Sequence, residues 1–236
     1  MPRRLTAGVW LLDLGLVEPV DAYAYLVDDA GDTGDGTVTL VDAGLFLNRP
    51  TLDDELAAAG DGYTLADIDR VLVTHYDLDH VGGLRAVAGH GVPVYVGAAD
   101  AALLAGEDDP PLLHHKGLFH RVARRVWPFP DVEVVPVADG EAVGGFRAYH
   151  TPGHNPGHTV YVHEGLGVAF LGDLVWGAEG GLTTPIWLDS YDMERLAASV
   201  QDLAGRVGEF EVAAMGHGDP LTAGGAAALA DLAERV

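Results

Sequence analysis

The segment THYDLDH, residues 74–80, places two histidines and two aspartates within seven positions. The apolar run VLV precedes it, and VGG follows it. This order predicts a buried strand that ends at a group of potential metal ligands, after which a helix begins. Alternate residues of an extended chain point the same way, so we expect His75, Asp77 and Asp79 to converge. His80 must point elsewhere, which suits a second metal ion.

Three further segments combine histidine or aspartate with glycine at the end of an expected strand. They are HTPGHNPGH (150–158), which holds His154 and His158, then FLGDL with Asp173, and MGHGD with His217. One such segment alone would usually be an ordinary polar loop. Four together predict a shared metal centre. Their histidines and aspartates are numerous enough for two metal ions that share one carboxylate.

The rest of the chain alternates between short apolar strands and amphipathic helices. Residues 1–43 read as strands and turns, and the clearest helices are expected within 50–60, 191–207 and 222–236. Strands followed by helices, twice over, predict an α+β or αββα arrangement of two mostly antiparallel sheets with helices outside. The stretch at about 98–128 is helical, irregular and basic at its end, which indicates a helical insertion or lid. We expect 1–236 to form a single domain.

The composition limits the classes of partner and chemistry. The 236 residues carry 36 acidic and 13 basic side chains, for a formal net charge of −23, and Lys116 is the only lysine. Such a surface repels phosphate backbones and anionic lipid, so neither nucleic acid nor a membrane is expected as a partner. The absence of cysteine excludes a thiolate metal site and a cysteine nucleophile. No signal peptide and no run of about 18 apolar residues is visible, so a cytoplasmic location is expected.

The motifs from LVDAG at 40–44 through THYDLDHVGG, TPGHNPGHT, GD and GHG resemble the metallo-β-lactamase fold superfamily in order and spacing. The resemblance covers most of the chain. It implies a four-layer αββα sandwich with the metal site along one sheet edge, and it implies two divalent ions. By matching position, the ligands of the first ion would be His75, Asp77 and His154. Those of the second would be Asp79, His80 and His217, with Asp173 bridging both.

Two further residues gain a role from the resemblance. His158 matches a position near the site that is usually not a ligand, and it is expected to orient a ligand or the substrate. Asp42 matches a structural aspartate near the floor of the site.

Asp77 departs from the usual pattern of the superfamily, H-x-H-x-D-H, although some branches carry aspartate there. A third carboxylate makes the centre less positive, which should make bound water less acidic and the metals weaker Lewis acids. Carboxylate is also a harder ligand than imidazole and favours manganese or iron. Zinc remains the first expectation because four histidines are present. An alternative is that Asp77 reaches its metal poorly and that the first site is weak or empty.

Side chains outside the ligand set are candidates for a substrate entrance or a pocket wall. The alternatives are a solvated helix face and ordinary core packing. The candidates for an entrance are His114, His115, His120 and Arg121 to Arg125, and those for a pocket are Trp127, Trp176, Trp187 and Phe46.

The leading hypothesis is a metal-dependent hydrolase that uses a metal-activated water on a small ester, thioester or lactone. Asp79 would orient this water and help to transfer its proton. The lactonase-like and glyoxalase-II-like branches share the TPGHxPGH loop. Two alternatives are an iron-dependent sulfur dioxygenase-like oxidoreductase and a non-catalytic metal-binding protein of the same fold. The expected partner is a small-molecule substrate, and the oligomeric state is left open, a homodimer being one alternative.

Overall fold

The computed structural model describes residues 1–15, 22–29, 36–45 and 50–236. In these residues, seven strands form a first sheet in the order β1-β2-β3-β4-β5-β6-β7. Neighbouring strands are antiparallel from β1 to β4 and parallel from β4 to β7. The strands are β1 (Arg3–Thr6), β2 (Val9–Asp13), β3 (Tyr23–Asp28), β4 (Val38–Val41), β5 (Arg70–Val73), β6 (Val94–Gly97) and β7 (Val134–Val137).

The parallel half of this sheet requires crossover connections, because a parallel neighbour cannot be reached by a tight turn. Helices supply them: α1 (Leu52–Ala58), α2 (Leu78–Val81), α3 (Leu84–Val87), α4 (Ala98–Leu104) and α5 (His115–Val126). Single 3₁₀ turns lie at Leu65–Asp67 and Ala88–His90. The prediction of mostly antiparallel sheets is therefore wrong for the first sheet.

A second sheet of five strands has the order β14-β11-β10-β9-β8. Its strands are β8 (Ala142–Val143), β9 (Phe146–His150), β10 (Thr159–His163), β11 (Val168–Gly172) and β14 (Val212–Met215). Only the pair of β11 and β14 is parallel among them. The connection between these two holds a hairpin, β12 (Trp176–Ala178) and β13 (Gly181–Thr183), then α6 (Met193–Arg206), and α7 (Gly225–Ala233) follows β14. Further 3₁₀ turns lie at Glu164–Leu166 and Trp187–Asp189.

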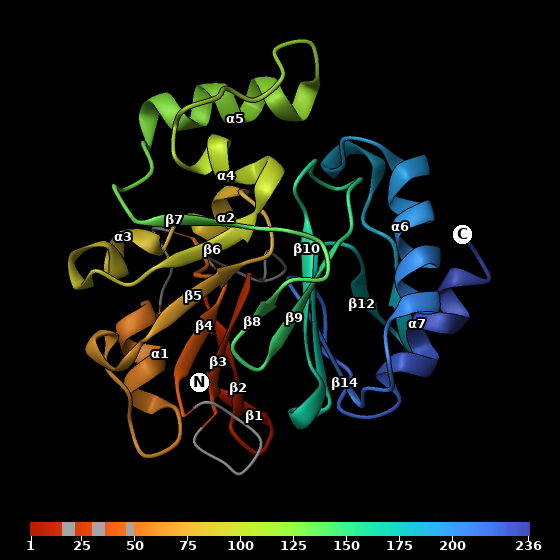
Figure 1. Cartoon of the computed structure of the whole chain (residues 1–236), viewed down its shortest axis with the longest axis horizontal. Coiled ribbons are helices and arrows are strands. Elements are labelled where there is room, and N and C mark those ends of the chain that lie inside the picture. The colour runs from red at the N-terminus through yellow and green to blue at the C-terminus, as the bar shows by residue number, and fades with distance from the viewer. Residues whose placement is uncertain (16–21, 30–35, 46–49) are drawn as a thin grey trace.

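Three apolar clusters separate four layers. One lies between the sheets, where Tyr25 and Leu72 of the first sheet pack with Phe146 and Phe170 of the second. The other two join each sheet to its own helices. Figure 1 shows α1 and α3 on the outer side of the first sheet and α6 and α7 on the outer side of the second. The predicted αββα sandwich is thus confirmed.

The expected helices are present, but some are shorter than predicted. The helix expected after THYDLDH is divided into α2 and α3 at Gly82 and Gly83. The stretch at 98–128 holds α4 and α5, as its composition indicated, and both lie beyond β6 at one end of the sheets (Figure 1). In the described part of the chain, every helix is too short or too polar to cross a lipid bilayer.

Candidate metal centre

The four histidine and aspartate segments meet at one end of the sandwich. THYDLDH follows β5, the loop 151–158 joins β9 to β10, Asp173 follows β11 and His217 follows β14. The two sheets are joined at this point by a hydrogen bond in which the amide of Thr159 donates to the carbonyl of Thr74, at 2.8 Å. Chain segments from both halves of the sequence therefore contribute side chains to the same site.

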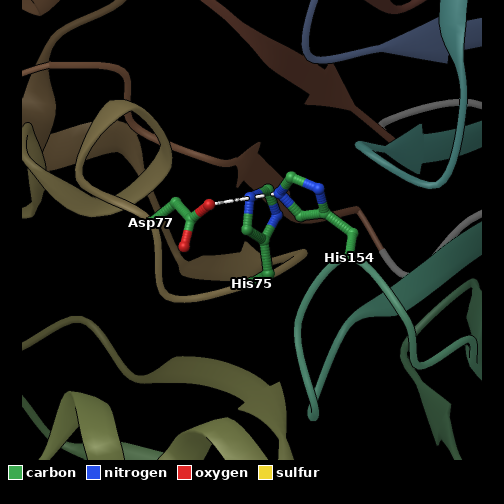
Figure 2. Close-up of side chains that lie close together, drawn as sticks. All are labelled: His75, Asp77 and His154. Atoms are coloured by element: carbon green, nitrogen blue, oxygen red, sulfur yellow. Dashed lines mark hydrogen bonds and ion pairs between the residues drawn. The ribbon is translucent and has the colours of Figure 1, made fainter. Parts of the chain in front are cut away.

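His75, Asp77 and His154, the ligands predicted for the first ion, lie in direct contact. Oδ2 of Asp77 is 3.1 Å from Nε2 of His154 and 3.4 Å from Nε2 of His75. Figure 2 shows the three side chains facing one another from two separate loops. All three are buried, and their candidate ligand atoms lie within 4.8 Å of one another.

The residues predicted for the second ion also come together. Nε2 of His217 lies 3.2 Å from Oδ2 of Asp79 and 3.2 Å from Oδ2 of Asp173. Nε2 of His80 lies 3.5 Å from Oδ1 of Asp173. Oδ2 of Asp173 is also 3.7 Å from Nε2 of His154, so this aspartate lies between the two groups, where a bridging ligand was expected.

A metal ion fits the second group. Nε2 of His80 and Oδ1 of Asp173 are buried, and neither finds a hydrogen-bond partner among the described residues. Buried polar atoms are almost always paired, so two unpaired ligand atoms 3.5 Å apart indicate a place that suits a cation. Imidazole nitrogen and carboxylate oxygen are the ligands that zinc and neighbouring divalent metals accept.

The electrostatics of the second group also favour a cation. Burial opposes ionisation of Asp79 and Asp173, but the His80 and His217 imidazoles beside them lower the pKa of both carboxyls. In turn, burial disfavours the charged form of His217, yet Asp173 and Asp79 raise its pKa to about 11. The ionised carboxylates of Asp79, which is partly exposed, and Asp173, which is buried, require compensating positive charge, which a divalent ion would supply in place of protonated imidazoles.

Asp42 and His158 support the ligands from behind. Asp42 has a φ of 57° and accepts hydrogen bonds from the amide and the hydroxyl of Thr74, both at 2.8 Å. Nε2 of His158 accepts from the amide of Asp173 at 3.1 Å, and Nδ1 lies 2.8 Å from the hydroxyl of Thr151. His158 therefore contacts the backbone that carries Asp173.

Lys116 was not predicted at the site, although it is the only lysine of the chain. It enters from the first turn of α5, with its side chain 3% exposed. Its Nζ lies 2.7 Å from Oδ2 of Asp77 and 2.9 Å from Nε2 of His154. The ammonium group thus contacts two of the three residues predicted to hold the first ion. Nε2 of His75, the third of these residues, is buried and finds no hydrogen-bond partner among the described residues, so Lys116 leaves this one ligand atom of the first group unpaired.

His120 and Asn155 bind the other oxygen of Asp77. Oδ1 accepts from Nδ2 of Asn155 at 2.7 Å and lies 3.1 Å from Nε2 of His120. Burial would raise the pKa of Asp77, but the Lys116 ammonium and His120 lower it well below its usual range. His120 was a candidate for a substrate entrance and is instead buried against Asp77.

Asp100, in the first turn of α4, was also missed. It is fully buried and accepts hydrogen bonds from the amide of Tyr76, at 3.1 Å, and the amide of Gly157, at 2.6 Å. Tyr76 and Gly157 belong to the two loops that carry His75 and His154. Asp100 therefore fixes the relative position of these loops, and no local sequence pattern indicates this role.

The remaining aromatic candidates have different positions. The ring centroid of Trp176 lies 5.3 Å from that of His217, so this tryptophan borders the second group. Trp187 is 69% exposed and packs against His115, and Trp127 is also exposed. Phe46 lies outside the described residues.

Comparison with known proteins agrees with the fold and the motifs. A family model of the metallo-beta-lactamase superfamily matches residues 17–217, and the chain belongs to this superfamily. The described residues of this chain include clusters of histidine and aspartate that could hold metal ions.

Similar proteins include two curated relatives. The hydroxyacylglutathione hydrolase of Aeromonas hydrophila subsp. hydrophila is 30% identical over 138 residues, which cover 57% of this chain and 45% of that protein. The probable metallo-hydrolase YybB of Bacillus subtilis (strain 168) is 26% identical over 197 residues, covering 81% of this chain and 80% of that protein. This chain thus spans less than half the length of the Aeromonas protein and most of the length of the Bacillus protein.

Among solved structures, the crystal structure of TTHA1623 in a di-iron-bound form is similar, with a TM-score of 0.65 and 26% sequence identity. The match covers 95% of this chain and 100% of that chain. The similarity extends over essentially the whole sandwich, which includes both sheets and their helices.

Proposed function

We propose that this chain is a metal-dependent hydrolase that cleaves a small ester, thioester or lactone. The observation that carries the proposal is the second group, Asp79, His80, Asp173 and His217, with buried and unpaired ligand atoms on His80 and Asp173. Zinc is the first expectation for the ion, because imidazole and carboxylate ligands occur together, and manganese and iron are alternatives.

Substrate would approach from the side of Asp79 and His217. Their side chains are 31% and 18% exposed, whereas those of His75 and His154 are fully buried. A partly open ligand set is typical of a catalytic metal site, whereas a closed one is typical of a structural site.

A divalent ion at this group would supply Lewis acidity and would lower the pKa of a bound water. The carboxylate of Asp79 is the most exposed acid of the group, so it would orient the attacking water and accept its proton. Trp176, beside His217, would limit how closely a bulky substrate can approach. His158 and Asp42 would hold Asp173 and His80 in place during turnover.

The substrate class is supported by the relatives. One is a hydroxyacylglutathione hydrolase, and another is a probable metallo-hydrolase. The net charge of −23 opposes polyanionic substrates such as nucleic acid, which leaves small acyl compounds as the favoured class.

The test combines metal reconstitution with a substrate panel. Purified protein would be freed of metal with a chelator, reloaded with zinc, manganese or ferrous iron, and assayed on thioesters, lactones and simple esters. We expect hydrolysis of at least one class that requires metal and that is lost in Asp173→Ala. Metal-dependent oxygen consumption without hydrolysis would instead favour a dioxygenase-like enzyme, and bound metal without turnover would favour a non-catalytic protein.

A further inference from the structure

We propose that Lys116 takes the place of the first metal ion, so that the chain binds a single divalent ion at the group of Asp79, His80, Asp173 and His217. The inference rests on the proposed metal-dependent function, since it concerns how many ions that function uses. It makes Lys116 a positioning residue that supplies a fixed positive charge beside the metal.

The ammonium group of Lys116 is fully satisfied where it lies. An ammonium has three N–H donors and no acceptor. Three acceptors surround Nζ at close range: Oδ2 of Asp77 at 2.7 Å, the carbonyl of Asp189 at 2.7 Å and Nε2 of His154 at 2.9 Å. A long cationic side chain that is buried, with every N–H donor paired, is held in one defined position.

The contacts of Lys116 use two of the three ligand atoms that a first metal ion would need, those of Asp77 and His154, and leave Nε2 of His75 unpaired. Because the ammonium can only donate, Nε2 of His154 must accept from it, and a neutral imidazole has one acceptor nitrogen. That lone pair is then not available to a metal. Oδ2 of Asp77 is occupied by the same group, and Oδ1 is held by Asn155 at 2.7 Å. A divalent ion entering here would also meet a positive charge at close distance.

The charges of the three candidate carboxylate ligands match one divalent ion and the Lys116 ammonium. Asp77, Asp79 and Asp173 contribute three negative charges when ionised. A second divalent ion would add two more positive charges beside the ammonium. The aspartate at position 77 and the only lysine of the chain therefore form a matched pair, which accounts for the departure from the usual H-x-H-x-D-H pattern.

The start of α5 is fixed so that Lys116 reaches the site. Nδ1 of His114 accepts from the amide of Lys116 at 3.3 Å, and Nε2 of His115 lies 2.7 Å from the carbonyl of Leu188. A Cβ at Gly117 would lie 2.1 Å from the carbonyl oxygen of Pro111, so only glycine permits this close approach. Helix α5 therefore places a cation beside Asp77 and His154.

The experiment counts bound metal and does not depend on turnover. Metal-free full-length protein would be equilibrated by dialysis against zinc alone and against manganese alone, and the bound ions per chain would be measured by mass spectrometry. We expect one ion per chain in the wild type and two in Lys116→Ala and in the double variant Asp77→His/Lys116→Ala. Arg125→Ala removes an exposed positive charge from the same helix and should leave the count at one.

A complementary variant tests the inference even if the Lys116 variants fold poorly. The double variant Asp79→Ala/His217→Ala should reduce the count from one to zero, because it removes two of the four ligands of the group that would hold the only ion. Two ions in the wild type, or one ion retained in this double variant, overturns the inference and leaves the proposed function standing. A count that stays at one in the folded Lys116→Ala and Asp77→His/Lys116→Ala variants also overturns it. A wild type that binds no ion overturns both the inference and the proposed function.

Discussion

Oδ2 of Asp42 lies 2.8 Å from Nδ1 of His80, on the side of the imidazole ring that faces away from Asp79, Asp173 and His217. This contact fixes the ring so that Nε2 faces Asp173 and Asp79. A carboxylate behind a ligating imidazole sets its tautomer and increases its basicity. Asp42 belongs to the LVDAG segment at the end of β4, so this strand supports the site beside the candidate ligands that follow β5.

Asp42→Asn should weaken metal binding with little change in fold. Asparagine tolerates the φ of 57° at this position, but it has a single acceptor oxygen where Asp42 uses both, for Thr74 and for His80. We expect the dissociation constant for zinc to increase about 10- to 100-fold. Competition with a chromophoric chelator would measure it. Asp231→Asn, an exposed carboxylate of α7, serves as the matched control, and equal constants in the two variants would contradict this role of Asp42.

The ligand segments could be found from the sequence because each is local. THYDLDH, TPGHNPGH, GD and GHG follow apolar strands directly, and strand ends gather at sheet edges. Lys116 could not be placed in this way, since its contact with Asp77 depends on how α5 docks over the loops. Asp100 lies in an ordinary helical pattern, VGAADAALL, and its bonds to Tyr76 and Gly157 arise only when three segments pack together. The strand directions of the first sheet were misjudged although helices were expected between β4, β5, β6 and β7, because strand direction depends on which strands pair, and local sequence patterns do not show the pairing.

Asp100→Ala should destabilise the protein considerably. It would leave the buried amides of Tyr76 and Gly157 without acceptors. Each unpaired amide costs about 1–3 kcal/mol of unfolding free energy. Asp100→Asn retains one acceptor oxygen and should lose about half as much as Asp100→Ala. Urea unfolding would measure both, with the exposed Asp131→Ala as control. If Asp100→Ala unfolds at the same urea concentration as the control, Asp100 does not hold the two loops together.

His158 should make the stability of the metal-free protein depend on pH. Burial, with the nearby His75 and His154 imidazoles, holds the pKa of His158 well below its usual range. The unfolded chain takes up a proton at His158 below about pH 6.5, whereas the folded chain does not. The contribution of neutral His158 to the free energy of unfolding is therefore complete above about pH 6.5. Below that pH it decreases by about 1.4 kcal/mol per pH unit.

His158→Gln tests this dependence because glutamine keeps an acceptor for the amide of Asp173 but does not titrate. The free energy of unfolding would be measured in urea, with chelator present, from about pH 6.5 to about pH 5. We expect the wild type to lose stability more steeply than the variant by about 1.4 kcal/mol per pH unit. Parallel curves for the two proteins would show that His158 is protonated equally in the folded and unfolded chains.

Gly216→Ala should disrupt the second group directly. A Cβ at this position would lie 2.2 Å from Oδ1 of Asp173 and 2.6 Å from Cε1 of His80, so both ligands must move. We expect metal binding to fall at least about 10-fold, since small displacements of ligands reduce affinity as strongly as loss of their supports.

Gly205→Ala in α6 is the matched control, because a Cβ there meets no neighbour. It should keep full metal affinity and should raise the free energy of unfolding by about 0.5–1 kcal/mol, as alanine favours a helix. The same dialysis count and urea unfolding measure both variants, and full metal binding by Gly216→Ala would mean that the group is held less tightly than these distances imply.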